Sequence, residues 1–140
     1  MASGLKIKKN GNVLISVSEL DKLEIIPIAQ DLEKLGFNIF ATTHTAHVLN
    51  SNLIATNMVK NTGEGENSAI SMIQSGKVDI IINTPSRKKL IEGDGFRIRR
   101  MAVERSIPCF TSLDTITAAI KTLKMGKKEQ DLEMIDINQV

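Results

Sequence analysis

The sequence predicts an α/β domain of three layers, in which helices cover both faces of an open, mostly parallel sheet. Two observations lead to this fold class. Short apolar segments typical of strands alternate with helix-like segments along the chain. The most apolar strand segment, residues 78–82, shows no alternation, as expected of a strand covered on both faces. The 140 residues show no internal repeat and no linker, so we expect a single domain.

The first half of the chain predicts three strands and two helices. Strands are expected over residues 12–17, 37–42 and 53–59, and a short helix over residues 43–50. Between the first two strands, apolar residues recur at every third position from Leu20 through Leu23 to Leu35, which predicts a helix that ends at Gly36. Pro27 interrupts this stripe, so the helix is either kinked there or regular only from about that residue.

The second half continues the alternation. Residues 61–67 have the composition of a loop. Helices are expected over residues 68–75, 96–105 and 113–124, and strands over residues 78–82 and 107–110. The last two helices should turn apolar residues inward, namely Ile98, Met101 and Ala102, and Ile116, Ala119, Ile120 and Leu123. The domain should therefore span residues 11–124, between a lead-in of residues 1–10 and a loosely held polar tail of residues 125–140.

The composition excludes several classes of partner. The formal net charge is only +2 and 24% of the residues are charged, so the chain as a whole is not an electrostatic nucleic-acid binder. No apolar run approaches the roughly 20 residues of a membrane span, so we expect no membrane partner. Cys109 is the only cysteine, which rules out an internal disulfide and favours a reducing, cytoplasmic location.

Polar side chains follow the expected strands at the points where those strands end. They are Lys22 after the first strand, Thr42 and Thr45 after the second, Lys60 after the third, and Asn83, Thr84 and Ser86 after the fourth. Ligands bind beyond the carboxyl ends of the strands in open parallel sheets. Hydroxyl, amide and ammonium groups beside a helix N-terminus suit a phosphate. Each Ser or Thr alone is more simply a cap or turn residue, whereas the whole set predicts a phosphate pocket.

Other motifs are weaker. His44 and His47 could both touch a metal, but a catalytic zinc needs about three protein ligands, so we favour solvent-facing histidines. Cys109 has apolar neighbours, which favours an inert thiol over a nucleophile. The basic runs 87–89 and 97–100 could attract nucleic acid, although such runs more often form a solvated face or a protein contact.

With these residues assembled, the chain resembles the C-terminal allosteric domain of the carbamoyl-phosphate synthetase large subunit, a family with the methylglyoxal-synthase-like fold. The resemblance extends over residues 11–124. It is carried by GNVLISV at residues 11–17, Asp21-Lys22, LGF at residues 35–37, Ala41-Thr42 with Thr45-Ala46, Ile82-Asn83-Thr84, and Ile98-Arg99-Arg100 with Ala102-Val103. The last two motifs, at this separation, are the most specific. The resemblance implies five parallel strands in the order 3-2-1-4-5.

The resemblance also implies a regulatory role in pyrimidine and arginine biosynthesis. Members of the family bind nucleotide effectors such as UMP and IMP, and this chain alone would not be an enzyme but part of an ATP-dependent ligase. The effector phosphate positions correspond to Lys22, Thr42, Thr45, Lys60 and Asn83, with Thr84 and Ser86 beside them. The implied partners are the rest of the large subunit, the glutaminase small subunit and further copies of the domain. No cofactor is implied here, because ATP and metal ions would bind in the catalytic regions.

Some positions depart from the family pattern. Pro85 stands where a Thr can contribute a hydroxyl, and Cys109 stands where some relatives offer a Tyr to ornithine. Sensitivity to ornithine therefore stays open, as do the identity of the effector and the sign of its effect. The chain begins close to the family's domain boundary, which favours an excised or separately encoded domain.

The alternative is that the chain resembles a methylglyoxal synthase acting on dihydroxyacetone phosphate, since that family has the same fold and also binds a phosphate. Asp94 falls near one catalytic Asp of that family, but Glu66 stands at the position of the other and residues 90–93 lack the expected histidine. A docking module for a protein partner is a third reading. Nucleotide binding without turnover would identify the effector domain, phosphate release the synthase, and neither property the docking module.

Overall fold

The structure, a computed structural model, describes residues 11–60, 68–84 and 94–129. In this part of the chain, five parallel strands form one sheet in the order β3-β2-β1-β4-β5. The strands are β1 (Asn12–Ser16), β2 (Asn38–Thr42), β3 (Thr56–Val59), β4 (Ile80–Asn83) and β5 (Cys109–Phe110). The predicted α/β fold and strand order are confirmed.

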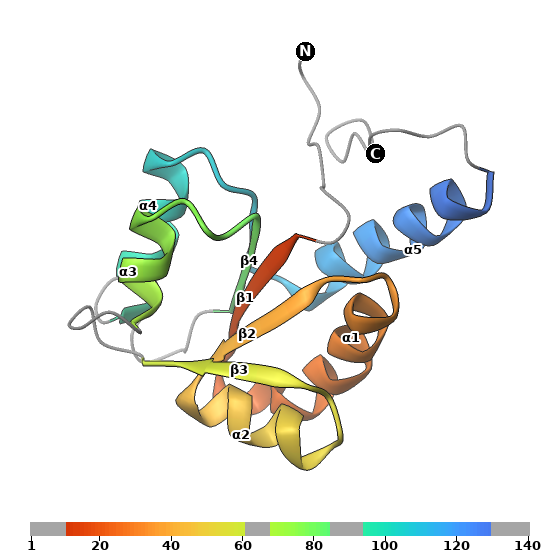
Figure 1. The fold of residues 1–140 in the computed structure, drawn as a ribbon, viewed down its shortest axis with the longest axis horizontal. Coiled ribbons are helices and arrows are strands. Elements are labelled where there is room, and N and C mark those ends of the chain that lie inside the picture. The colour runs from red at the N-terminus through yellow and green to blue at the C-terminus, as the bar shows by residue number, and fades with distance from the viewer. Residues whose placement is uncertain (1–10, 61–67, 85–93, 130–140) are drawn as a thin grey trace.

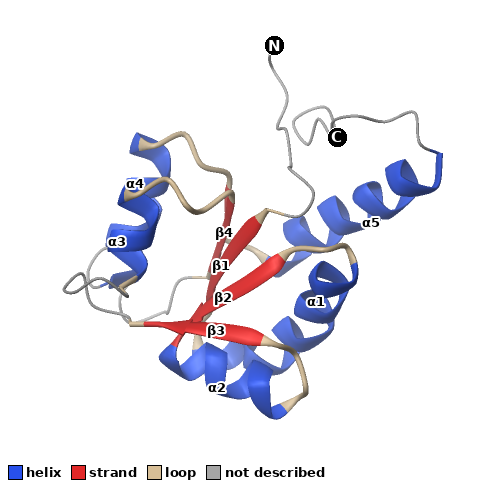
Figure 2. Cartoon of the chain, viewed as in Figure 1, coloured by secondary structure: helices blue, strands red, loops and turns tan. Residues whose placement is uncertain are grey.

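Helices lie on both faces of the sheet (Figures 1 and 2). One face carries α1 (Lys22–Lys34), α2 (Thr43–Ser51) and α5 (Leu113–Glu129), and the other carries α3 (Ala69–Gln74) and α4 (Asp94–Glu104). A single 3-10 turn, η1 (Glu19–Asp21), leads into α1. Among the described helices, none is both long and apolar enough to cross a membrane.

The central strands contribute to an apolar core on each face, because successive side chains of a strand point to opposite faces. Val13 and Ile15 of β1 pack with residues of α1, α2 and α5, whereas Leu14 packs with residues of α3 and α4. Strand β4 divides its isoleucines in the same way. This burial on both faces explains why residues 78–82 show no alternation of polar and apolar positions.

The buried face of helix α1 differs from the predicted apolar stripe. Its buried residues are Ile25, Ile28, Ala29 and Leu32, whereas Leu20 and Leu23 are 73% and 79% exposed. A strict three-residue spacing advances about 300° per step, so it drifts by about 60° each time and cannot stay on one helix face. The helix begins at Lys22 and contains Pro27, so a start near Pro27 is wrong. The missing Pro27 N–H is tolerated because the carbonyl it leaves unpaired belongs to the exposed Leu23.

Other predicted boundaries differ by a few residues. Strand β3 begins only at Thr56, because Leu53 turns the chain with φ 64° and the Asn50 side chain bonds to N and O of Thr56 at 3.1 and 3.2 Å. Helix α5 continues to Glu129 rather than ending at residue 124. Lys and Glu are good helix formers, so the polar composition after residue 124 did not mark a helix end. The predicted inward faces of the last two helices are confirmed, with Ile98, Ala102, Ile116, Ala119, Ile120 and Leu123 buried and Met101 partly buried.

Candidate functional site

Three polar side chains lie side by side where the central strands end. Ser16 of β1 lies opposite Asn83 of β4, and Ile15 lies opposite Ala41, which sets Ser16 beside Thr42 of β2. Oγ1 of Thr42 donates to Oγ of Ser16 at 3.2 Å. By strand alternation, all three side chains belong to the sheet face that carries α3 and α4. We call Ser16, Thr42 and Asn83 the polar row.

Arg99 of α4 contacts one end of the polar row. Its Nη1 donates to Oδ1 of Asn83 at 2.5 Å. Because a guanidinium only donates, the contact fixes the amide: Oδ1 faces Arg99, and the Nδ2 hydrogens are left to donate elsewhere. Asn83 is buried and Arg99 half-buried, so solvent weakens this contact little. The site residues chosen from the sequence include Asn83 but not Ser16 or Arg99, and the sequence signal for Arg99 was the Ile98-Arg99-Arg100 motif.

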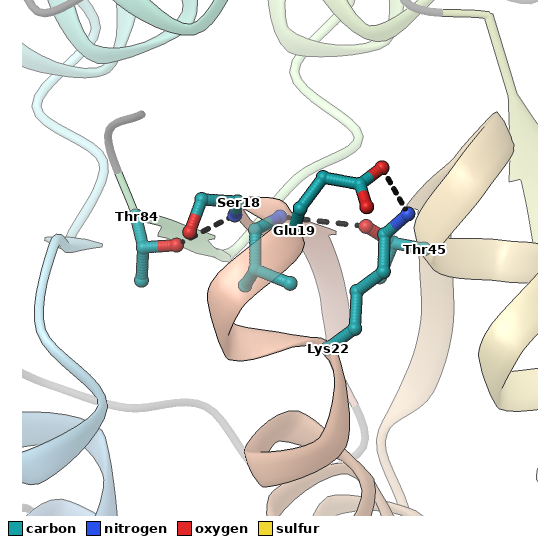
Figure 3. Close-up of polar contacts among 6 residues, drawn as sticks. Ser18, Glu19, Lys22, Thr45 and Thr84 are labelled. Atoms are coloured by element: carbon teal, nitrogen blue, oxygen red, sulfur yellow. Dashed lines mark hydrogen bonds and ion pairs between the residues drawn. The ribbon is translucent and has the colours of Figure 1, made fainter. Parts of the chain in front are cut away.

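The segment after β1 is held between two threonine side chains (Figure 3). The N–H of Val17 donates to Oγ1 of Thr45 at 3.4 Å, and the N–H of Ser18 donates to Oγ1 of Thr84 at 2.9 Å. Thr45 and Thr84 are only 1% and 8% exposed. Each hydroxyl accepts in its contact, so its own hydrogen remains able to donate to a ligand. Both threonines therefore hold the backbone of the β1–α1 segment in place.

Lys22 brings a positive charge to the Thr45 side of this segment (Figure 3). Its side chain is 17% exposed, and its Nζ donates to Oε1 of Glu19 at 2.8 Å. The Glu19 side chain is 82% exposed. The hydrogen bond from Lys22 and the positive charge of Lys22 hold the pKa of Glu19 below its ordinary value. The ammonium group thus already binds an anionic oxygen of the kind that a phosphate would offer.

The N-terminus of α2 lies at the same edge of the sheet. Thr42 is the N-cap of α2, but its side chain makes no capping hydrogen bond and donates to Ser16 instead. The first N–H groups of a helix lack intrahelical partners and carry partial positive charge. The N–H groups of residues 43–45 can therefore receive an anion in the turn that contains Thr45.

Two predicted site residues remain to be placed. Lys60 is exposed and directly follows Val59, which lies opposite Thr42, so Lys60 also stands at the carboxyl edge of the sheet. Ser86 lies outside the described residues, as do the basic run 87–89 and the predicted loop 61–67. The structure thus gathers Lys22, Thr42, Thr45, Lys60, Asn83 and Thr84 at one edge.

An acidic hollow opens on the other side of Thr84. It has a volume of about 320 Å³ and is lined by Asp21, Glu24, Thr84, Thr111, Ser112, Leu113 and Asp114. Three carboxylates around one hollow repel a phosphate. We call this feature the acidic hollow; its charge makes this side of the β1–α1 segment unfavourable for an anion.

The remaining candidate groups do not form a second site in the described chain. His44 and His47 are exposed on α2. No group of three or more His, Cys, Asp or Glu in the described segments is placed to hold a metal ion. Burial raises the pKa of the Cys109 thiol to about 11, so it stays protonated near neutral pH and is a poor nucleophile, as predicted.

Comparison with known proteins assigns the family. The sequence model of the MGS-like domain matches residues 24–111, more than half of the chain. The chain belongs to the MGS-like domain family. The matched stretch contains all of the gathered residues except Lys22, which lies just before it.

Two solved structures share the fold of this chain. The crystal structure of methylglyoxal synthase from Elizabethkingia anophelis NUHP1 matches with a TM-score of 0.64 and 18% identity, covering 83% of this chain and 79% of that chain. The crystal structure of ForH matches with a TM-score of 0.58 and 18% identity over the same shares of the two chains. At this level of identity, the likeness establishes the fold alone.

Proposed function

We propose that this MGS-like domain is a regulatory domain that binds the phosphate of a nucleotide effector of the UMP or IMP type. In this proposal it is the allosteric domain of the large subunit of a glutamine-dependent carbamoyl-phosphate synthetase in the cytoplasm. The observation that carries the proposal is the set of donors at one edge of the sheet. Lys22, the Thr45 hydroxyl and the uncapped N-terminus of α2 converge there beside the polar row.

The chemistry of these groups suits binding of a phosphate. An ammonium group, hydroxyls, a fixed amide and backbone N–H groups are all donors, and a phosphate offers only acceptors. Proton transfer beside a carbonyl, by contrast, needs a positioned acid or base. The polar row contains neither a carboxylate nor an imidazole. The row itself therefore supplies binding groups, and an acid or base for turnover would have to come from outside it.

Regulation would follow from unequal binding to two states of the synthetase. The effector can shift the equilibrium only by its difference in affinity for those states, and a coupling of about 1–3 kcal/mol is typical. The catalytic regions of the large subunit and the glutaminase subunit would be the partners that respond. The pathways served would be those of pyrimidines and arginine.

Methylglyoxal synthase activity is the competing proposal, and the structural likeness to the Elizabethkingia enzyme is the observation in its favour. The two acids considered for that reaction are Glu66 and Asp94. Glu66 and the side chain of Asp94 lie outside the described part of the structure. Release of phosphate from dihydroxyacetone phosphate would decide for the synthase.

Calorimetric titration with UMP, IMP and inorganic phosphate tests the proposal directly. Lys22→Ala should weaken binding of every phosphate ligand at least tenfold, because a hydrogen bond to a charged group contributes about 1.5–3 kcal/mol. Lys34→Ala is the matched control, since Lys34 is an exposed lysine in the last turn of the same helix. Failure of all three ligands to bind would overturn the proposal, and equal losses in both variants would show that Lys22 is not a site residue.

A further inference from the structure

We infer that Glu19 is an internal competitor for the phosphate of the effector. Its carboxylate binds the Lys22 ammonium group in the unliganded domain and must leave when a phosphate takes its place. The inference rests on the proposed function, because it concerns the same ligand at the same site. Glu19 would thus lower the affinity of the domain for phosphate without contacting the ligand itself.

The contact between Glu19 and Lys22 is built into the backbone. Both belong to one turn, in which the N–H of Asp21 donates to the carbonyl of Ser18 at 3.0 Å. The Ser18 hydroxyl also donates to Oδ2 of Asp21 at 3.1 Å. Ser18 is itself anchored to Thr84, so the position of the turn is fixed. Glu19 precedes Lys22 by three residues, and the turn brings Oε1 of Glu19 to 2.8 Å from Nζ of Lys22.

The two partners differ strongly in exposure. The Lys22 side chain is 17% exposed and is seen on the Thr45 side of the segment, whereas the Glu19 side chain is 82% exposed. Glu19 can therefore swing into solvent without uncovering buried surface, while the ammonium group remains in the site (Figure 3). An ion pair with one freely solvated partner is weak and exchangeable.

A phosphate should win this competition. In this contact, Glu19 accepts one hydrogen bond, from the Lys22 ammonium group. A phosphomonoester dianion carries about twice the charge and three oxygens, which could also accept from the Thr45 hydroxyl and the N-terminus of α2. The pair therefore does not block binding, but it reduces the fraction of molecules whose Lys22 is ready for a ligand.

The expected effect on affinity is modest and measurable. Exposed ion pairs favour the paired state by a factor of about 1.4 to 5, so the apparent dissociation constant is raised by about two- to sixfold. Glu19→Gln keeps the size of the side chain and removes its charge. This variant should bind inorganic phosphate and UMP about two- to sixfold more tightly than the unsubstituted chain.

A spectroscopic signature separates competition from a general change in charge. Lys22 is the main cause of the lowered pKa of Glu19, and the charge of His44 contributes least. When phosphate takes the ammonium group, Glu19 loses this partner, and the added negative charge lies nearby. The pKa of the Glu19 carboxyl, followed by carbon NMR, should therefore rise on saturation with phosphate.

The experiment compares the full chain with Glu19→Gln and Glu24→Gln, each titrated calorimetrically with inorganic phosphate and with UMP. Glu24 is an exposed carboxylate two residues from Lys22 with no ion pair to it, so it controls for loss of one negative charge. A gain confined to Glu19→Gln, including binding seen only in that variant, supports the inference. Equal gains in both variants, no gain in Glu19→Gln, or an unchanged pKa of Glu19 on saturation would overturn it while leaving the proposed function intact. Absence of binding to all three proteins would overturn both.

Discussion

The two sides of the β1–α1 segment use the same residue type in opposite electrostatic surroundings. On one side, Thr45 accepts from the N–H of Val17 and lies beside Lys22 and the N-terminus of α2. On the other side, Thr84 accepts from the N–H of Ser18 and lines the acidic hollow. The backbone contacts are alike, yet the charges nearby would attract a phosphate to one side and repel it from the other.

A threonine near a strand end therefore does not by itself predict a phosphate site. Its hydroxyl can hold a loop on either side, and the fixed charges nearby decide whether it also meets a ligand. Lys22 and Asp21 are neighbours in the sequence, yet Asp21 lines the acidic hollow and Lys22 faces Thr45. The charge boundary between the two sides therefore runs through the start of α1.

Substitution of the two threonines by valine should give opposite results in two assays. Thr45→Val should weaken UMP binding about tenfold or more, because a hydrogen bond to a charged ligand contributes about 1.5–3 kcal/mol. Thr84→Val should change UMP affinity less than about twofold. In urea unfolding the order should reverse. Thr84→Val should lower the free energy of unfolding by about 1–3 kcal/mol, because the N–H of Ser18 loses its acceptor.

The reversal depends on the geometry of the two contacts. The Thr45 contact, at 3.4 Å, is near the limit for a hydrogen bond, so its loss should destabilise the fold less than loss of the 2.9 Å contact of Thr84. If Thr84→Val weakened UMP binding as much as Thr45→Val did, the contrast between the two sides would be wrong. Calorimetry and urea unfolding on the same protein samples provide both measurements.

Arg99 tests whether the polar row belongs to the Lys22 side. Arg99→Met should lower the free energy of unfolding by about 1–3 kcal/mol, because Oδ1 of the buried Asn83 loses a donor. Combining it with Asn83→Leu should recover part of that loss, since the double variant no longer buries an Oδ1 that lacks its donor. The double variant should still bind UMP more weakly than the unsubstituted chain, because the Nδ2 donors of Asn83 are absent. Recovery of binding together with stability would show that Asn83 does not contact the ligand.

The fold was largely readable from the sequence because its signals are local. An unbroken apolar run such as residues 80–82 indicates a strand buried on both faces, and Ile116, Ala119 and Ile120 share a helix face by spacing alone. The stripe from Leu20 misled, since a three-residue spacing fits a helix only over short stretches. The extension of α5 to Glu129 was missed because polarity and helix propensity point in different directions there.

The site was readable only in part, because it is assembled by strand register. Thr42 and Asn83 end their strands and Thr45 follows Thr42 in the first turn of α2, so all three could be chosen from the sequence. The place of Ser16 between Thr42 and Asn83 depends on pairing partners from three strands. The contact of Arg99 with Asn83 depends on how α4 packs against the sheet. Neither contact leaves a periodic trace in the sequence.

The smallest expected effect concerns the acidic hollow itself. Asp114 is an exposed carboxylate that lines the hollow together with Thr84. At about 0.15 M salt the Debye length is about 8 Å, so Asp114→Asn should tighten UMP binding less than about twofold. At about 0.01 M salt the Debye length increases to about 30 Å, so screening is weaker and the gain in affinity should become larger. Titrations at the two salt concentrations measure this difference. A gain above about fivefold that persists at high salt would mean that the hollow and the Lys22 side form one site, and a loss of binding would place the ligand in the hollow.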